Sequence, residues 1–448
     1  MTTSWLGRAL DRHWLIYLVV CATFALHLGM LSVFPRIPVE LDQGVFVKQG
    51  KRLAQQGLVE WKYNARAPGY IFFVATNFLV SGEDRLGFVR VAQSALAATT
   101  AAALYGLTQL AFTSIARRRR QVIGLLAALV YAVTPDYLFF SQTVWAEAYF
   151  IFLLVLAFCF LLRAFRQEKR WYWFLASGVL FGAATLTREF LILFAAGFVP
   201  LWLVLTHLPQ WRAGVARALV FLLGVILVIA PYTYRNYVNL QAFELISWEG
   251  GHTFWMDTAL ALTPGTTKRA LRPGLRKLDP ATRNRELYAR GFELVLAQPV
   301  TWVLVKANEP AKIWTDLESN LFVYGAALKL IVPQGAELWR VGLRVFWLVL
   351  LDLIIIGVVL AQDSRAKLLW AFYLLASIAA YFATHYQTRF RLPLAILFLP
   401  YAAYSAVELV RMLRTPGALA TLDRKRILVA ACVLLLVNWQ ALPVVAAA

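Results

Sequence analysis

Two carboxylates, Glu40 and Asp42, follow directly on the first long apolar segment of this 448-residue chain. An aspartate at a membrane surface can act as a general base toward an acceptor hydroxyl, which is worth roughly 10²- to 10⁴-fold in rate. It can also cap the helix that we predict after it, because Asp accepts hydrogen bonds from the first free N–H groups of a helix. The two roles are compatible. Glu40 lies two residues earlier and is expected to raise the pKa of its neighbour by like-charge repulsion.

A second group of side chains lies at or just beyond the ends of apolar segments, on the predicted side of Asp42. Guanidinium groups hold phosphate bidentately, so this group predicts an anionic ligand at that surface. Taken singly, each cation is equally well explained by contact with a lipid headgroup. The members are Arg66, Arg188, Arg235, His385, Arg389 and Arg391.

Two further acids, Glu147 and Asp352, lie inside or at the edge of apolar segments. Ionisable residues within a membrane are costly and are therefore candidates for function. Glu147 is predicted near the outer face, within reach of the candidate site. For Asp352 we favour a structural hydrogen bond or salt bridge within the helix bundle.

The composition indicates a polytopic membrane protein, because 60% of the residues are hydrophobic and only 15% are charged. The net charge of +20 comes from 44 Lys+Arg against 24 Asp+Glu, and cytoplasmic loops that concentrate basic residues explain it without a nucleic-acid partner. No zinc-type, Walker or Rossmann spacing is present. Cys21, Cys159 and Cys432 are isolated in apolar runs and are predicted to be small core residues, neither disulfide-bonded nor metal ligands.

The elements that must position these side chains are membrane-spanning helices, since about 20 apolar residues cross a bilayer core. The first segment is too long for a signal peptide and is predicted to be an anchor. Basic clusters fall between alternate segments, on the side of the N-terminus, so we predict a cytoplasmic N-terminus and, after an odd number of crossings, an exoplasmic C-terminus. The eleven predicted spans are 14–34, 86–113, 121–138, 144–163, 171–187, 190–207, 215–233, 338–361, 366–384, 392–411 and 427–445.

Two segments on the opposite face, 35–85 and 234–337, are too long to be simple turns and are typical of functional loops. The residues after Asp42 have near-helical apolar spacing and predict a helix in the membrane interface. Residues 68–80 predict a second interfacial or re-entrant helix, and 298–314 an amphipathic one. We therefore divide the chain into a membrane module (1–233), an exoplasmic unit (234–337) and C-terminal membrane helices (338–448).

Six stretches together resemble a known family. In chain order they are "LDQGVFVKQGKRLAQQG", "RAPGYIFFVA", "WAEAYFIFL", "GAATLTREFLILF", "PYTYRNYVNLQAFELISWEGG" and "TRFRLPLAILFLPYAA". Each is degenerate alone, but their order on eleven predicted helices resembles the GT-C superfamily of glycosyltransferases, family 39-like. Its members include the dolichyl-phosphate-mannose–protein mannosyltransferases and the aminoarabinose transferases.

The resemblance implies an all-α membrane bundle in the cell membrane, with interfacial helices and an active site facing the exoplasm. There a sugar would pass, with inversion, from a polyprenyl-phosphate donor to a lipid, glycan or protein acceptor. Asp42 matches the catalytic acid of the family. Gln43 stands where a second acid is common, so a paired role would fall to Glu40 or elsewhere. Arg66 matches the basic residue before the family's proline-rich turn, and the other outer cations are candidates for holding the donor phosphate.

Such a reaction needs only a base and electrostatic stabilisation of the leaving phosphate, so we predict no metal and no cofactor. The principal alternative is a transporter or flippase for a lipid-linked or anionic solute. Transporters tend to show internal repeats and helices broken at the midplane. No repeat is visible, and the polar residues collect at helix ends, which favours chemistry at the surface. A further alternative is a non-enzymatic subunit that binds a lipid-linked glycan.

Overall fold

The computed structural model describes most of the chain, and every regular element in the described residues is a helix. The described residues are 14–34, 37–63, 65–82, 85–167, 170–208, 210–263, 265–267, 278–328, 336–362, 364–415 and 424–446. The residues before Trp14, and Lys169 in the basic cluster between the predicted spans 144–163 and 171–187, lie outside them.

All eleven predicted spans are helical in the structure. They are α2 (Trp14–Val33), α5 (Leu86–Ala111), α6 (Arg117–Val133), α8 (Glu147–Arg166), α9 (Tyr172–Thr185), η1 (Leu193–Phe198) continued by α10 (Val199–Leu205), α11 (Trp211–Leu240), α17 (Ala336–Leu360), α18 (Ser364–Ala383), α19 (Arg391–Arg414) and α20 (Arg424–Ala446). Among the described residues, six helices are long and apolar enough to cross a membrane. A seventh is possible if α6 and α7 (Pro135–Gln142), bent by 57° at their junction, form one span.

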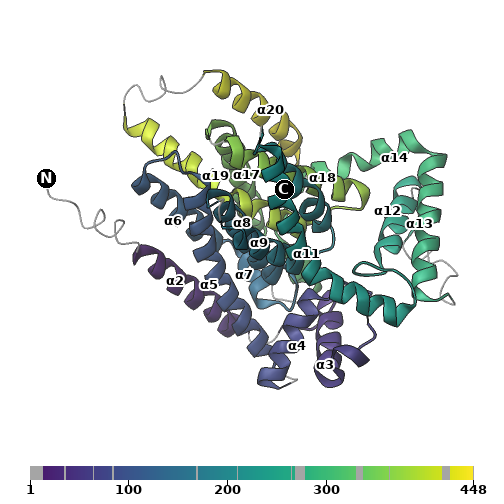
Figure 1. The fold of residues 1–448 in the computed structure, drawn as a ribbon. Helices are drawn as coiled ribbons and strands as arrows, with labels where there is room; N and C mark the ends of the chain where they lie inside the picture. The colour runs from purple at the N-terminus through teal and green to yellow at the C-terminus, as the bar shows by residue number, and fades with distance from the viewer. Residues whose placement is uncertain are drawn as a thin grey trace.

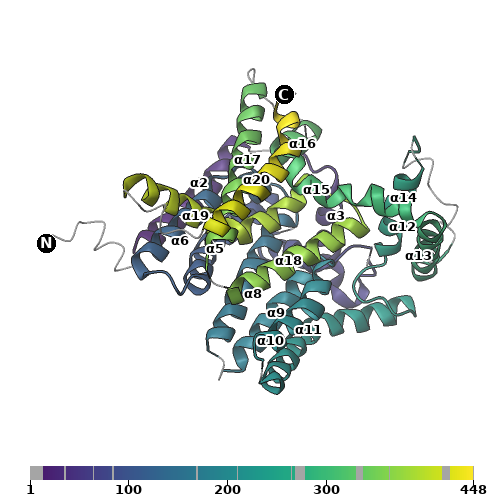
Figure 2. The same cartoon turned by 90° about the horizontal axis from the view of Figure 1, so that it is seen from above.

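The helices form one bundle whose parts are joined by α19. One series of packed neighbours runs α6–α5–α8–α9–α11, and a second group contains α17, α19 and α20. Figure 2 shows α8 to α11 along one side of the bundle and α2, α5 and α6 along another. Small residues permit the closest of these contacts, as is usual in membranes. A Cβ on Gly178 of α9 would lie 2.0 Å from the carbonyl oxygen of Phe221 on α11.

The segment 37–82 folds into two packed helices, α3 (Asp42–Glu60) and α4 (Gly69–Ser81). Both were predicted, but α4 is more deeply enclosed than an interfacial helix, because Tyr70, Ile71 and Val74 are fully buried. Figure 1 shows the pair at one edge of the bundle. The second long loop contains α12 (Gly250–Leu262), α13 (Pro280–Ala297), α14 (Pro299–Lys306), α15 (Asn308–Thr315) and α16 (Asn320–Ala327).

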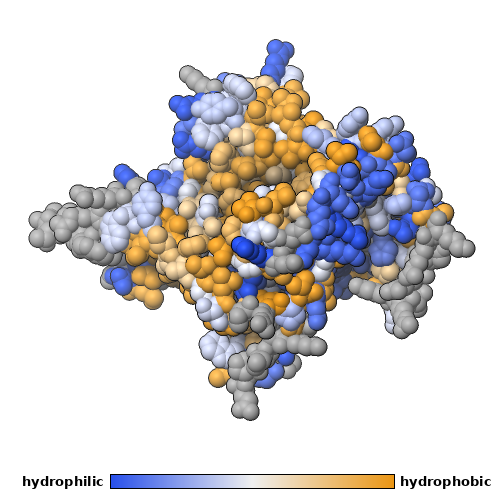
Figure 3. All heavy atoms as spheres, turned by 90° about the horizontal axis from the view of Figure 1, so that it is seen from below, coloured by the Kyte–Doolittle hydropathy of each residue, from blue (hydrophilic) through white to orange (hydrophobic). Residues whose placement is uncertain are grey.

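Helices α12 to α14 stand to one side of the bundle in both ribbon views (Figures 1 and 2). Helices α12 and α13 share a small core of their own, made by Trp255, Met256, Ala259 and Leu287. Hydrophilic residues gather on that side of the molecule, whereas the bundle presents a broad hydrophobic surface (Figure 3). Helix α11 connects the two regions. Its 30 residues correspond to about 45 Å, more than a bilayer core, so its last turns project beyond the apolar part of the bundle.

The basic ends of several helices meet at the end of the bundle away from Asp42. Arg119 pairs with Glu408 at the end of α19, and Arg426 donates to the carbonyl of Leu360 at the end of α17. This arrangement agrees with the predicted clustering of basic residues on one side.

The prediction for the cysteines is wrong for two of the three, because Cys21 and Cys432 are exposed on helix surfaces rather than buried. Asp352 accepts hydrogen bonds from Asn438 at 3.2 and 3.3 Å, which confirms its structural role.

Candidate active site

Asp42 is the first residue of α3, and its carboxylate is held by two arginines. Arg66 Nη1 lies 2.9 Å from Oδ1, and Arg389 Nη1 lies 3.0 Å from Oδ2. The alternative role as a helix cap is absent, because no side chain caps α3 and its N-cap residue is Leu41. Leu41 has φ 57° and ψ −136°, a backbone conformation that residues other than glycine rarely adopt. Strained backbone therefore directly precedes the candidate base.

A second carboxylate, Glu147 at the start of α8, extends this group inward. Arg188, in the turn after α9, pairs with Glu147 Oε1, and Arg389 Nε lies 3.6 Å from the same oxygen. The Glu147 side chain is only 2% exposed. We call Asp42, Arg66, Glu147, Arg188 and Arg389 the arginine–carboxylate cluster. Its members come from five segments, and the three guanidiniums exceed the two carboxylates by one charge.

The charges of the cluster govern the protonation of Asp42. Burial raises the pKa of its carboxyl, but the positive charges of Arg389 and Arg66 outweigh burial. The pKa is consequently held below the ordinary value of 3.8. Asp42 is therefore ionised at neutral pH, as a general base must be. Its low proton affinity in this state means that the arginines also restrain it as a base.

The remaining sequence candidates lie outside the cluster. Glu40 is exposed and has no ion pair among the described residues, so it is not a member of the cluster. Arg235 lies over the Trp61 ring at 4.9 Å and donates to the carbonyl of Tyr63 at 3.2 Å.

Arg391 is fully buried and has structural contacts. It donates to the carbonyl oxygens of Asp316 at 2.5 Å and Glu318 at 2.9 Å, and it stacks on Trp347 at 4.1 Å. It therefore fastens the start of α19 to the segment before α16. Arg389, only two residues away, points into the cluster instead.

His385 reaches the cluster only through other side chains. Its Nδ1 lies 2.7 Å from Asp257 Oδ2 on α12, and Gln387 Nε2 donates to its Nε2 at 2.8 Å. Gln387 Oε1 in turn accepts from the Tyr324 hydroxyl at 3.4 Å, and the Tyr324 ring lies 5.7 Å from the Arg389 guanidinium. A continuous series of polar contacts thus joins the α12–α14 unit to Arg389.

Sequence reasoning missed two acids near the cluster, both on loops. Glu249, just before α12, lies 3.8 Å from Arg66 Nε. Glu189, next to Arg188, has its pKa raised to about 7, chiefly by burial and further by the charges of Glu249 and Glu244, against a hydrogen bond from Ser247. The position of Glu189 in "LTREF" was a usable signal. No local pattern indicated Glu249, because its proximity to Arg66 depends on the path of the chain after α11.

Gln43, which replaces the family's second acid, has a structural role. It is 1% exposed, donates to the carbonyl of Pro38 at 3.1 Å and accepts from the amide of Val144 at 2.9 Å. These bonds fix the start of α3 against the turn that precedes α8. An acid at this position would be enclosed, so no paired-carboxylate role falls to residue 43.

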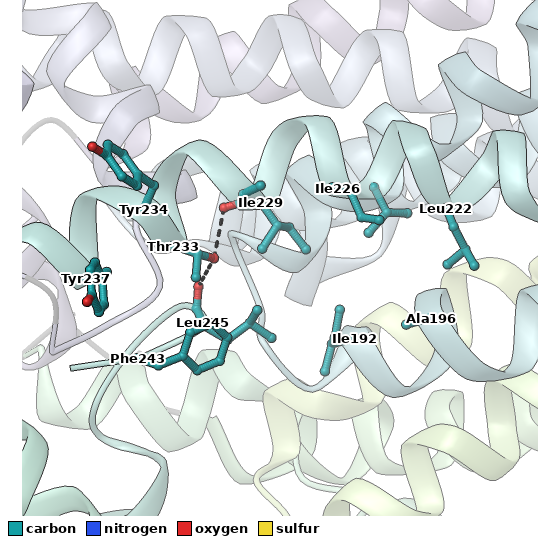
Figure 4. Close-up of a pocket in the computed structure, with 12 residues that line it drawn as sticks. Ile192, Ala196, Leu222, Ile226, Ile229, Thr233, Tyr234, Tyr237, Phe243 and Leu245 are labelled. Carbon is teal, nitrogen blue, oxygen red and sulfur yellow. Dashed lines mark hydrogen bonds between the residues drawn. The ribbon is translucent and has the colours of Figure 1, made fainter.

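An apolar cavity of about 550 Å³ lies between α11, η1 and the loop after α11 (Figure 4). Ile192 and Ala196 line one wall, and Leu222, Ile226 and Ile229 the other. Ile226 and Tyr234 are 55% and 70% exposed, so the cavity opens on the outer surface of the bundle. Its lining residue Ile192 follows Arg188 of the cluster by four positions in the chain. Among the described residues, no group of three or more His, Cys, Asp and Glu side chains could hold a metal ion.

Comparisons with known proteins agree with this architecture. Residues 65–234 match the protein family described as dolichyl-phosphate-mannose-protein mannosyltransferase, a stretch that contains Arg66, Glu147 and Arg188. The apo oligosaccharyltransferase of Archaeoglobus fulgidus aligns with 98% of this chain and 56% of its own, at 13% identity and a TM-score of 0.54. The oligosaccharyltransferase AglB from the same organism, in complex with an inhibitory peptide and a dolichol-phosphate, aligns with 99% of this chain and 56% of its own, at 13% identity and a TM-score of 0.52.

ArnT from Cupriavidus metallidurans bound to undecaprenyl phosphate aligns with 89% of this chain and 78% of its own, at 14% identity and a TM-score of 0.41. No curated protein sequence matches the chain. The chain spans little more than half the length of the archaeal enzyme. The fold is thus shared with the archaeal oligosaccharyltransferase. The predicted resemblance to the family-39-like transferases is confirmed over residues 65–234, by their match to the dolichyl-phosphate-mannose-protein mannosyltransferase family.

Proposed function

We propose that this protein is a membrane glycosyltransferase that moves a sugar, a hexose or pentose, from a polyprenyl-phosphate donor to an acceptor hydroxyl, with inversion and with Asp42 as the general base. The reaction takes place at the exoplasmic face of the cell membrane, on the side of the exoplasmic C-terminus and opposite the cytoplasmic N-terminus. The acceptor is a lipid, a glycan or a protein. The observation that carries the proposal is the ionised Asp42 carboxylate between Arg66 and Arg389.

The reaction balances with these side chains alone. Asp42 takes the proton of the acceptor hydroxyl while its oxygen attacks the anomeric carbon. The bond between that carbon and the phosphate oxygen breaks, and its electron pair leaves with the polyprenyl phosphate. Arg66, Arg188 and Arg389 stabilise the charge on the departing phosphate, as preorganised cations do in a water-poor site.

Donor binding also changes Asp42 as a base. The phosphate oxygens compete with the carboxylate for Arg66 and Arg389, which now hold the pKa of Asp42 low. Once the phosphate neutralises these cations, the pKa of Asp42 rises and the carboxylate becomes a stronger base. The arrangement therefore favours proton removal only when a donor is in place, which limits the exposure of an active base without substrate.

The apolar cavity beside η1 and α11 accommodates the prenyl chain of the donor in this proposal. Its lining is mostly apolar, it opens on the outer surface of the bundle, and Ile192 in its wall follows Arg188 by four positions in the chain. The AglB structure with bound dolichol-phosphate supports a lipid-phosphate ligand on a bundle of this fold.

The proposal is tested by mass spectrometry of envelope glycolipids, glycans and glycoproteins. Cells that carry the gene, cells that lack it, and cells complemented with Asp42→Asn are compared. A glycan present with the wild-type gene and missing from both other strains identifies the sugar and the acceptor. Full restoration of that glycan by Asp42→Asn at equal protein abundance would exclude Asp42 as the base. An unchanged profile in the strain without the gene would exclude the transferase.

A further inference from the structure

The end of α13 and most of α14 form an uncharged stretch, residues 294–305, with the sequence "LVLAQPVTWVLV". We call this stretch the apolar edge. Most of its side chains are exposed, and among them Leu296 is 78% exposed, Val300 70% and Leu304 66%. Single apolar side chains are normal on a soluble surface, whereas a contiguous group of them marks a surface that contacts a protein or a membrane.

Contacts with α18 place the apolar edge at a boundary of the membrane. The Trp302 ring lies 5.1 Å from the Phe382 ring, and Lys306 donates to the carbonyl oxygen of Thr384. Helix α18 is long and apolar enough to cross a membrane, and it ends between these two α18 contacts. The polar N–H of Trp302 donates to Thr258 of α12 at 3.3 Å, so the ring has the apolar and polar sides that suit a membrane–water boundary.

The lipid-facing surface of the bundle leads directly to this contact. Leu375, Ala379 and Phe382 are spaced by four and three residues, so they share one face of α18. Leu375 is 49% exposed and Ala379 is exposed as well. Trp302 packs on Phe382, the last of the three, and the exposed side chains of α14 extend the apolar surface beyond it. Because lipid covers the α18 part of this surface, lipid is also the partner that fits the α14 part.

The length of the apolar edge also indicates a position in the membrane interface. A span needs about 20 apolar residues, and shorter exposed segments lie at the boundary instead. The first half of α13 has a different character, since its exposed residues include Arg285. Leu296 lies three helical turns beyond Arg285 on the same face, or about 16 Å along the axis. Helix α13 can therefore meet the bilayer with its C-terminal end while its N-terminal half stays in water.

We propose that the apolar edge inserts into the membrane interface beside the bundle, on the side of the arginine–carboxylate cluster, with the acyl chains of membrane lipids as its partner. The α12–α14 unit is then held in two ways. The bundle holds it through Trp302 and Lys306, and the bilayer holds it through side chains such as Leu296 and Leu304.

The proposal is tested by fluorescence on the full-length protein in lipid nanodiscs that hold one copy each. The three cysteines of the chain are replaced by alanine, and a polarity-sensitive dye is attached to Leu304→Cys, Leu296→Cys or Arg285→Cys. We expect the dye at 304 and 296 to emit at shorter wavelength and to lose fluorescence to lipids with a nitroxide near the headgroup, more than to lipids with a nitroxide at the chain end. Arg285→Cys is the matched control, and its dye should be quenched by aqueous iodide instead.

Iodide quenching at 304 and 296 equal to that at 285, without quenching by either lipid, would overturn the insertion. Stronger quenching by the chain-end nitroxide would contradict a position in the interface. An apolar environment that appears only in nanodiscs with two copies would assign the surface to a second copy of this chain rather than to lipid. If Leu304→Cys misfolds, the highly exposed Leu296→Cys keeps the test decisive. The measurement needs no sugar donor, so its outcome is independent of the proposed transferase.

Discussion

Substitution of Asp42 by asparagine separates catalysis from folding in this protein. Loss of a general base lowers the rate roughly 10²- to 10⁴-fold, which corresponds to about 2.7 to 5.5 kcal/mol in the activation barrier. The same change costs the fold less. Arg389 loses a charged hydrogen bond worth about 1.5 to 3 kcal/mol but keeps Glu147 at 3.6 Å. Arg66, with a side chain 34% exposed, loses about 0 to 1 kcal/mol and keeps Glu249 at 3.8 Å.

The assay is sugar transfer in liposomes, with the donor and acceptor identified from the envelope glycans. Thermal unfolding is measured in parallel, so that the loss of rate is compared with the loss of stability. Asp352→Asn provides a matched control, since this carboxylate is hydrogen-bonded to Asn438 within the bundle. The variant should retain near-normal transfer. A folded Asp42→Asn protein with more than a tenth of wild-type kcat would refute the assignment of the base.

Three other variants probe the surroundings of the base. Arg66→Gln removes a cation that lowers the pKa of Asp42; the acidic limb of kcat/KM should therefore move to higher pH, and the KM for the donor should rise about tenfold more than the KM for the acceptor. Glu189, with a pKa of about 7, gains negative charge near the site as pH rises from 6 to 8; wild-type KM for the anionic donor should rise across this window and stay flat in Glu189→Gln. Ala196→Trp fills the apolar cavity and should impair use of long-chain donors, whereas Leu193→Trp, on the exposed side of the same helix, should not; equal transfer by both variants would place the prenyl chain elsewhere.

Much of the architecture could be predicted from the sequence, because a bilayer imposes length and hydropathy on each span. All eleven predicted segments are helices, and the residues after Asp42 form a helix as their apolar spacing indicates. The contact of Asp42 with Arg66 and of Glu147 with Arg188 also follows from placing helix ends on a common side.

The sequence could not distinguish residues that lie close together in the chain but whose side chains point to different sides. Arg389 and Arg391 are two residues apart, yet the first enters the cluster and the second is buried against Trp347, because η3 and the first turn of α19 turn them to different sides. Glu40 and Asp42 also differ, since Glu40 is exposed and Asp42 contacts two arginines, on either side of Leu41 with its positive φ. Glu249 joins Arg66 only through the folded loop after α11, which no local pattern encodes.

The contacts that run from Asp257 through His385, Gln387 and Tyr324 toward Arg389 have a consequence for protein engineering. Consider a chimera that receives α12 to α14 from another sequence, to change the molecule that is glycosylated. In such a chimera residue 257 comes from the new sequence, whereas its partner His385 does not. An acid kept at position 257 preserves the partner of His385 and, through Gln387 and Tyr324, the surroundings of Arg389. A donor sequence without it would disturb turnover for every acceptor alike, and a defect of that kind would be misread as failed recognition.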